Sequence, residues 1–467
     1  MFTTLRKWWE DGETWFAAVG LANLALGTSS VLIPLMVSEI LHRSAGAVGI
    51  LSAMVSLVGV IGSLIWGRLS DAAHRRRPFV VISYAAVGAS LAAISLTRAF
   101  SHLLLYNMVL NFFWVANAAV TVLIVIENRN SESWERKISH LNQIGAIGWL
   151  AGLGLGSGMM VLATRWVGEA AAMRILLGVI ALISVLAAFL AARLIPRTTP
   201  KFTRRRFRGT ILAMGNFLVE KARFAPFHLY HRFRPRLIWA AIRNPAGFSL
   251  GTRRFLVATL VAYVALGLFA IPLPLLLAER FAIPSAAVFL FFAIQHVGVV
   301  IAYPLAAERI RKRGNRYVQG SALLVRVALF GFTAIYLVLG GNAPSTAVLI
   351  IAFLVYGVTW SYFQLSGVAL ASRLAKPENR GLVLGLYNAL AGLGWIIAGL
   401  GSSALIDRWG FQAVYAASAG CLVLSLVALV RVPDPSCAAA SEASQTGRFS
   451  RLRAQRATTT AARAHSR

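Results

Sequence analysis

The sequence predicts an all-α membrane protein with twelve transmembrane helices in two pseudo-symmetric six-helix bundles. Of its 467 residues, 58% are hydrophobic and only 13% are charged, which is more apolar side chain than one soluble core can bury. The apolar stretches run about 20 residues each, the length with which a helix crosses roughly 30 Å of hydrocarbon. Strands of a membrane barrel would instead show short segments of alternating polarity, so we expect helices.

The apolar stretches fall into two groups of six. Residues 1–195 form the expected N-terminal bundle and residues 253–432 the C-terminal bundle. The basic segment 196–252 joins them, either as a helix on the membrane surface or as a disordered linker, and residues 433–467 are expected to be a disordered basic tail. The expected spans are 15–37, 45–67, 78–97, 102–126, 138–163, 173–195, 253–278, 284–306, 317–339, 344–370, 381–404 and 411–432.

The basic residues indicate how the chain is oriented. With a cytoplasmic N-terminus, 39 of the 46 Lys and Arg lie on the inner side, six on the outer side and one in mid-membrane. This is the positive-inside pattern. We therefore expect a multi-pass protein of the cell inner membrane with both termini and residues 196–252 in the cytoplasm. Its basic loops would face anionic lipids rather than nucleic acid.

An internal repeat supports two equivalent halves. Six residues of the first span recur in the seventh with one common offset of 240, and three of the fifth recur in the eleventh with an offset of 246. Two parallel six-helix halves are typical of one large class of transporters. The matched residues are Ala25, Leu26, Gly27, Pro34, Leu35 and Glu39 with Ala265, Leu266, Gly267, Pro274, Leu275 and Glu279, and Asn142, Gly148 and Trp149 with Asn388, Gly394 and Trp395.

The loop after the second span carries a recognisable motif. It reads Gly67, Arg68, Leu69, Ser70 and Asp71, followed by Arg75, Arg76, Arg77, Pro78 and Phe79. This resembles the signature loop of the major facilitator superfamily, which implies that family's twelve-helix fold and secondary transport. The run from Arg75 to Phe79 resembles the sugar and glycoside carriers of that superfamily, which favours a neutral polar solute.

The same resemblance implies a conformational latch. In the superfamily the aspartate lies near the N-terminus of the eleventh helix, where the helix dipole favours a negative charge. We expect Gly67, Asp71, Arg75, Arg76 and Arg77 to form this latch on the cytoplasmic side. The alternative is that these arginines only follow the positive-inside rule.

Polar side chains inside the spans are the candidates for a substrate site, because they are costly in lipid. A stripe in the fourth span and another in the tenth would face the central cavity that the resemblance implies, and Asn23 and Tyr263 are equivalent in the repeat. Hydrogen bonding between helices, without substrate, is the alternative for each. The candidates are Asn23, Asn107, Asn111, Trp114, Asn117, Tyr263, Gln295, His296, Tyr356, Trp360, Gln364 and Asn388.

Two further groups lie in mid-span. His296 titrates in the range suited to proton coupling, although a lone histidine is commonly structural. Arg326 in the ninth span is expected to make a structural contact or to extend towards the inner surface. No cluster of His, Asp, Glu or Cys at membrane depth suggests catalysis, metal or cofactor binding, so an enzyme is not expected.

These observations predict a monomeric secondary transporter working by alternating access. Its partners would be a small-molecule substrate, such as a sugar or another neutral polar solute, and a coupling ion, either proton or sodium. Aromatic and amide side chains also suit amphiphiles, so export of small hydrophobic or amphiphilic compounds is the alternative function.

Overall fold

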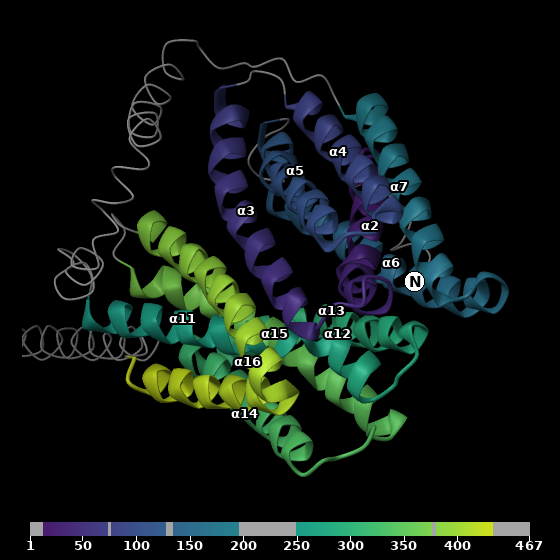
Figure 1. Ribbon diagram of the computed structural model, residues 1–467. Coiled ribbons are helices and arrows are strands. Elements are labelled where there is room, and N and C mark those ends of the chain that lie inside the picture. Colours follow the sequence, from purple (N-terminus) through teal and green to yellow (C-terminus); the bar gives the residue numbers. More distant parts are fainter. Residues whose placement is uncertain (1–12, 73–75, 128–133, 196–248, 376–379, 433–467) are drawn as a thin grey trace, which may run out of the picture.

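The computed structural model describes residues 13–72, 76–127, 134–195, 249–375 and 380–432, and all the regular structure in these ranges is helical. Residues 196–248 of the expected linker 196–252, and the expected tail 433–467, lie outside the described residues. The last residues of the expected linker already belong to α11, which begins at Leu250. The N-terminal half contains six long helices (Figure 1), which are α2 (Phe16–Glu39), α3 (Ala45–Ala72), α4 (Arg77–Leu96), α5 (Phe100–Glu127), α6 (Trp134–Val167) and α7 (Glu169–Leu194).

The C-terminal half repeats this plan with interruptions. Its elements are α11 (Leu250–Ala270), α12 (Leu273–Leu275), the π-helical turn η2 (Leu276–Arg280), α13 (Ser285–Arg313), α14 (Asn315–Val338), α15 (Thr346–Leu374) and α16 (Arg380–Val430). Pro272 and Pro274 fall where the seventh span breaks into α11, α12 and η2. A proline removes a backbone donor and crowds the preceding turn, which accounts for the break.

The predicted fold class is confirmed. Within the described ranges, ten helices are long and apolar enough to cross a membrane. One of them, α16, contains Gly410 with φ 75° and ψ −175°, so it runs as two helices joined at that residue. The 28-residue apolar helix α5 occupies the place of the expected fourth span.

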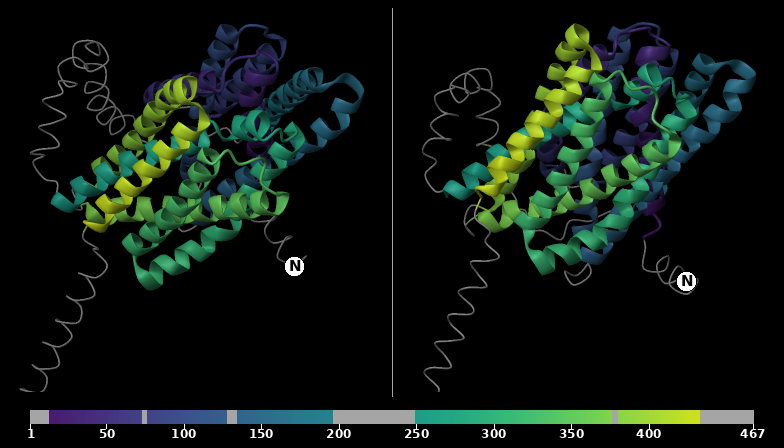
Figure 2. Two further views of the ribbon diagram at one scale, coloured as in Figure 1. Left: turned by 60° about the horizontal axis from the view of Figure 1, so that its bottom comes forward. Right: turned by 90° about the horizontal axis from the view of Figure 1, so that it is seen from below.

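The hydrogen bonds between the described parts of the two halves lie at one end. We call the end that holds residues 13, 195, 249 and 432 the terminal end, and the opposite end the distal end. Among the described residues, three hydrogen bonds join the halves, and all lie at the distal end. Ser38 donates to Glu279 at 2.5 Å, Ser285 donates to Glu169 at 2.5 Å, and the Ser157 hydroxyl donates to the Ala286 carbonyl at 2.9 Å. Figure 2 shows the two bundles from further directions.

The helix pairs α3 with α16, α6 with α13, and α2 with α12 form this junction. Within each half, tight pairs such as α4 with α7 and α13 with α15 hold the bundle together. The protein is therefore two packed bundles that meet mainly along α3 with α16 and α6 with α13, an arrangement in which one bundle can rock against the other.

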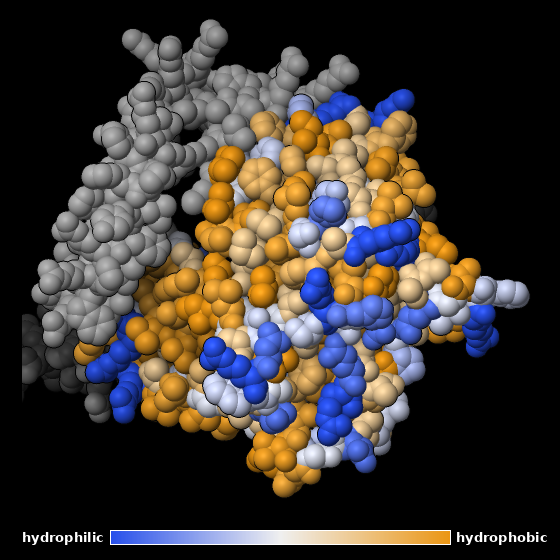
Figure 3. Space-filling view, in the orientation of Figure 1, coloured by the Kyte–Doolittle hydropathy of each residue, from blue (hydrophilic) through white to orange (hydrophobic). Residues whose placement is uncertain are grey.

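The outer surface is suited to lipid. Apolar side chains cover most of the visible face of both bundles in Figure 3. Large apolar side chains such as Leu182, Phe332 and Ile335 are more than half exposed. In water such a surface would be costly, whereas hydrocarbon accepts it without loss.

Candidate functional site

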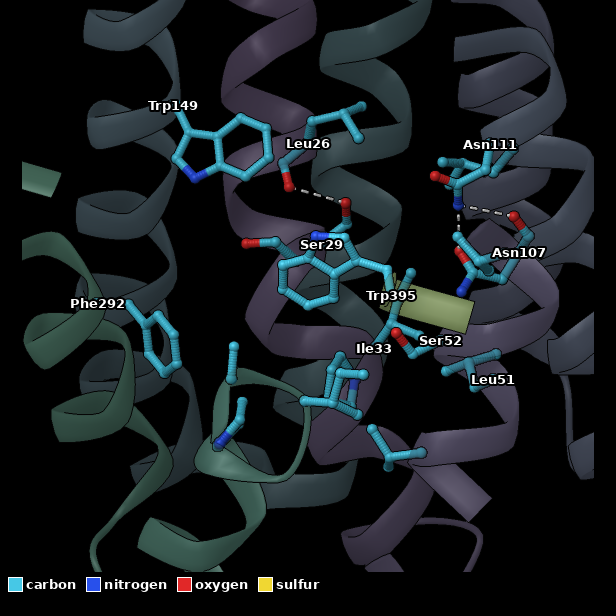
Figure 4. Close-up of a pocket in the computed structure, with 18 of the residues that line it drawn as sticks. Leu26, Ser29, Ile33, Leu51, Ser52, Asn107, Asn111, Trp149, Phe292 and Trp395 are labelled. Carbon is cyan, nitrogen blue, oxygen red and sulfur yellow. Dashed lines mark hydrogen bonds between the residues drawn. The ribbon is translucent and has the colours of Figure 1, made fainter. Parts of the chain in front are cut away.

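A cavity of about 420 Å³ lies between the two halves, beside the seam that joins them. Figure 4 shows side chains from both halves converging on it. Helices α2, α3, α5 and α6 supply one wall, and α11, α12, α13 and α16 with the short link after α11 supply the other. A cavity that both repeats share is the expected place for a transported solute.

The repeat residues explain why these helices converge. In the N-terminal half, a Cβ on Gly27 would lie 2.4 Å from the Trp149 carbonyl oxygen, so only glycine allows α2 to pack this closely on α6. In the C-terminal half, a Cβ on Gly267 would lie 2.5 Å from the Ala398 Cβ and 3.3 Å from the Trp395 ring. Equivalent glycines, Gly27 and Gly267, therefore allow an equivalent close helix contact in each half.

This packing places two tryptophans at equivalent positions, Trp149 on α6 and Trp395 on α16, and both line the cavity (Figure 4). They were not among the candidates from sequence, although the repeat contains them as an identical pair. An indole ring offers an apolar face for stacking and one N–H donor at its edge. The two rings are the largest flat surfaces in the cavity wall.

Polar groups face the cavity from α2 and α5. Asn111 donates from its amide nitrogen to the Asn107 carbonyl at 2.9 Å and to the Asn107 side-chain oxygen at 3.1 Å. Within the described residues the amide nitrogen of Asn107 has no partner, and Ser29 donates to the Leu26 carbonyl at 3.0 Å. Asn107 can therefore donate to a solute, and the Asn111 oxygen can accept.

His296 on α13 joins the two halves across the cavity wall. Its ring is stacked on Trp149, with centroids 5.6 Å apart and planes 9° apart. Its Nδ1 atom is buried and has no hydrogen-bond partner among the described residues. Gln295 lines the cavity beside it. Among the described side chains that line this cavity, His296 is the one that carries an ionisable group.

Other candidates from sequence lie outside this lining. Asn23 bonds to the Val19 carbonyl at 2.8 Å, and Asn117 accepts from the Tyr84 hydroxyl at 2.7 Å in the N-terminal bundle. Trp114 packs against the hydrophobic core. Asn388 is exposed.

The polar stripe of the tenth span, on α15, contacts other residues of the C-terminal bundle and not the cavity between the halves. Gln364 accepts from the Tyr263 hydroxyl at 2.8 Å, and Tyr263 also bonds to Tyr387 at 3.2 Å. Neither Gln364 nor Tyr263 lines the cavity between the halves. The structure therefore brings Asn107, Asn111, Gln295 and His296 together and places the tenth-span stripe in a separate cluster.

Tyr356 and Trp360 of that stripe surround Arg326. The guanidinium is fully buried, donates to the Tyr356 carbonyl at 2.9 Å, and lies 4.7 Å from the Tyr356 ring, 5.7 Å from Trp360 and 5.9 Å from Phe330. Cation–π contacts of this kind stabilise a charge that has left water. Arg326 is thus held inside the bundle and does not extend to the surface.

The latch residues lie at the terminal end. Helix α3 continues through Gly67 and Asp71 to Ala72, but their side chains, like the whole of Arg75, lie outside what the structure describes. Arg76 is buried, and Arg77 begins α4. The latch therefore remains a prediction from sequence.

The distal end has a tight junction that sequence reasoning did not single out. A Cβ on Gly49 of α3 would lie 2.4 Å from the Gly399 carbonyl oxygen of α16 and 2.7 Å from the Ser403 nitrogen. A Cβ on Gly46 would lie inside the Asp407 carboxylate. The Asp407 charge thus sits at the N-terminal end of α3, where the helix dipole favours it.

No group of three or more His, Cys, Asp or Glu that could hold a metal occurs within the described residues. Fold and cavity together define the class of protein: an all-helical membrane protein with two six-helix halves around a central cavity, the architecture of secondary transporters. The sequence matches the family model of the Major Facilitator Superfamily over residues 15–364 and 255–462. The chain belongs to this family.

Solved structures of transporters share the fold. A mutant form of the nucleoside transporter NupG is 14% identical with a TM-score of 0.67, over 90% of this chain and 98% of that chain. A mutant of the peptide transporter POT in complex with alafosfalin is 14% identical with a TM-score of 0.66, over 89% and 93%.

A third similar structure is that of a bacterial homologue of the human lysosomal transporter Spinster, in an inward-facing and unoccupied conformation. It is 12% identical with a TM-score of 0.62, over 89% of this chain and 93% of that chain. Comparison with curated protein sequences finds no match. Identities this low carry the fold and leave the substrate open.

Proposed function

We propose that this member of the family moves a small neutral solute across the cell inner membrane by alternating access. The observation that carries the proposal is the cavity between two repeated halves whose hydrogen bonds to each other, among the described residues, lie at one end. Rocking about the cavity would open the distal end and close the terminal end around the same site. The proposal includes no catalytic step, and the working unit is one chain.

The cavity favours a neutral solute. None of the described residues that line it is Lys, Arg, Asp or Glu, and a charged solute would lose its hydration there without a partner. Trp149 and Trp395 offer stacking surfaces, while Asn107 and Asn111 offer a donor and an acceptor. Sugars, glycosides and similar ring compounds combine a flat apolar face with hydroxyl groups, so they fit this set.

Export of a hydrophobic or amphiphilic compound is a second candidate function, and the apolar part of the wall favours it. Ile33, Leu51, Leu110 and Phe292 face the cavity without polar groups. An amphiphile could place its apolar body there and its polar end on Asn107.

A ligand screen separates these candidates. The purified full-length protein is heated with neutral glycosides, with uncharged amphiphiles and with charged analogues of both, and ligands that raise the melting temperature are then tested for flux in proteoliposomes. Stabilisation and flux by neutral ring compounds support the first candidate, and selective stabilisation by amphiphiles supports the second. A preference for charged analogues would overturn both.

His296 would couple transport to protons. The proposal rests on its position in the cavity wall and on its unpartnered Nδ1. His296→Gln should abolish ligand-driven proton movement in proteoliposomes, whereas His102→Gln, an exposed histidine of α5, should leave it unchanged. Flux driven equally well by sodium, or proton movement retained in His296→Gln, would contradict this role.

The charge distribution supports a cytoplasmic location for the terminal end, so the state described here would face the cytoplasm. Cysteines placed at Thr210 and Ser444 should resist an impermeant thiol reagent in intact cells and react after lysis. Labelling in intact cells would reverse the orientation.

A further inference from the structure

A second cavity, of about 330 Å³, lies at the terminal end of the C-terminal bundle, away from the central site. It is formed where α11 and α14 begin and α16 ends. Three arginines line it together with apolar side chains, one arginine from α11, one from α14 and one directly after α16: Arg254, Arg316, Arg431, Leu250, Val430 and Val432.

Main-chain contacts hold two of the arginines in place. Arg254 donates from Nη1 to the Arg431 carbonyl at 3.2 Å, and Arg316 donates from Nη1 to the Val432 carbonyl at 2.8 Å. A guanidinium has five N–H donors, so most of the donors on each remain available. These contacts also occupy carbonyls at the end of α16 that would otherwise repel an anion.

The surroundings of this cavity are positive. None of the three arginines forms an ion pair with a carboxylate in the described part of the chain. Helices α11 and α14 both begin here, at Leu250 and Asn315, and a helix N-terminus carries a partial positive charge. Three cations, two of them held by hydrogen bonds, and two helix starts around one cavity form a site for an anion. Arginine matches the geometry of phosphate in particular.

The rim of the cavity indicates which kind of molecule would carry a phosphate group into it. Leu250 and Val430 are 54% and 66% exposed, and both belong to helices that are apolar enough to cross the membrane. The cavity therefore opens at the border between the lipid-facing surface and the basic end of the bundle. A phospholipid can place its acyl chains along the apolar side chains and its phosphate among the arginines.

We propose that this cavity binds the phosphate group of an anionic phospholipid in the leaflet at the terminal end. The lipid bridges α11, α14 and the end of α16, three elements that must move together when the C-terminal bundle rocks.

The proposal is tested by melting the purified full-length protein in detergent during titration with phosphatidylglycerol, phosphatidylcholine or inorganic phosphate. Phosphatidylglycerol should stabilise the protein at the lowest concentration. Arg431→Gln is the main variant, because the Arg431 side chain makes no hydrogen bond within the described residues and its loss should not disturb folding. This variant and Arg316→Gln should each weaken the effect about fivefold, the contribution of one arginine near a membrane surface.

Arg373→Gln is the matched control, since Arg373 is exposed at the same end of the bundle but lies outside this cavity. An equal loss in the control would mean that the effect is general surface charge, and the site would be refuted. Equal stabilisation by phosphatidylcholine would refute the charge argument. Stabilisation by inorganic phosphate at the same concentration, with the same dependence on Arg431, would assign the site to a soluble phosphate and overturn the lipid proposal.

Discussion

Replacing Gly49 with alanine should shift the protein away from the state in which the distal ends touch. The new Cβ would lie 2.4 Å from the Gly399 carbonyl oxygen and 2.7 Å from the Ser403 nitrogen, both backbone atoms that cannot rotate away. Overpacking of this kind costs about 1–3 kcal/mol. If the contact exists only in this state, the ratio of distal-closed to distal-open molecules should fall by about 5-fold to 150-fold, since 1.4 kcal/mol corresponds to tenfold.

Spin labels on cysteines at Arg43 and Arg408, both exposed at the distal end of opposite halves, report the change as a distance distribution measured by double electron–electron resonance. Gly49→Ala should move the population towards longer distances. Gly154→Ala is the matched control, because a Cβ on Gly154 meets nothing within 4 Å and gains the same helix propensity. The reasoning is refuted if Gly49→Ala keeps the wild-type distribution, or if the control shifts as much.

Three further variants test other parts of the account. Trp395→Ala should weaken ligand binding at least tenfold, because a stacking ring is lost from the cavity, whereas Trp166→Ala, at an 88% exposed site on α6, should leave the affinity unchanged; both are measured by ligand titration. Arg326→Leu should change the melting temperature and keep the ligand affinity, since Arg326 lies outside the cavity lining; a loss of affinity at unchanged stability would place it in the binding site. Asp71→Asn should retain expression and melting temperature but lower the transport rate severalfold in proteoliposomes, and a wild-type rate would make Asp71 a marker of topology only.

The fold could be predicted from the sequence because a helix that crosses lipid must be apolar along its whole span. Each span must be apolar over about 20 residues, so the stretches can be counted, and α16 shows that even a short turn at Gly410 separates two of them. The repeat could be predicted from the sequence for a related reason. A larger side chain than glycine at Gly27 or at Gly267 would overlap the neighbouring helix, so both halves have glycine at this position.

Only part of the cavity lining could be predicted from the sequence. Asn107 and Asn111 stand one helical turn apart, so their shared face follows from the period of the helix. Periodicity cannot show which neighbour that face meets. Tyr356 and Trp360 also share a face, yet that face meets Arg326 of α14, 30 residues earlier in the chain.

The two cavity tryptophans were not predicted from the sequence, for a different reason. Trp149 and Trp395 appeared in the repeat, but apolar aromatic residues are common in every span and carry no polar signal. Their role emerged when α2 with α6 and α11 with α16 were seen to place both rings in the same wall. A residue pair that is identical in both repeats and large enough to reach the midline is the signal that could have identified them.

The most direct test of alternating access through this cavity is flux with the distal end locked. Cysteines at Ser38 and Glu279, whose side chains are hydrogen-bonded between the halves, are joined by a short thiol cross-linker in a variant with Cys421 and Cys437 changed to Ser. The locked protein in proteoliposomes should still bind its ligand from the terminal side and should not transport it, and a cleavable cross-linker should restore flux on cleavage. Wild-type flux through fully cross-linked protein would contradict the account.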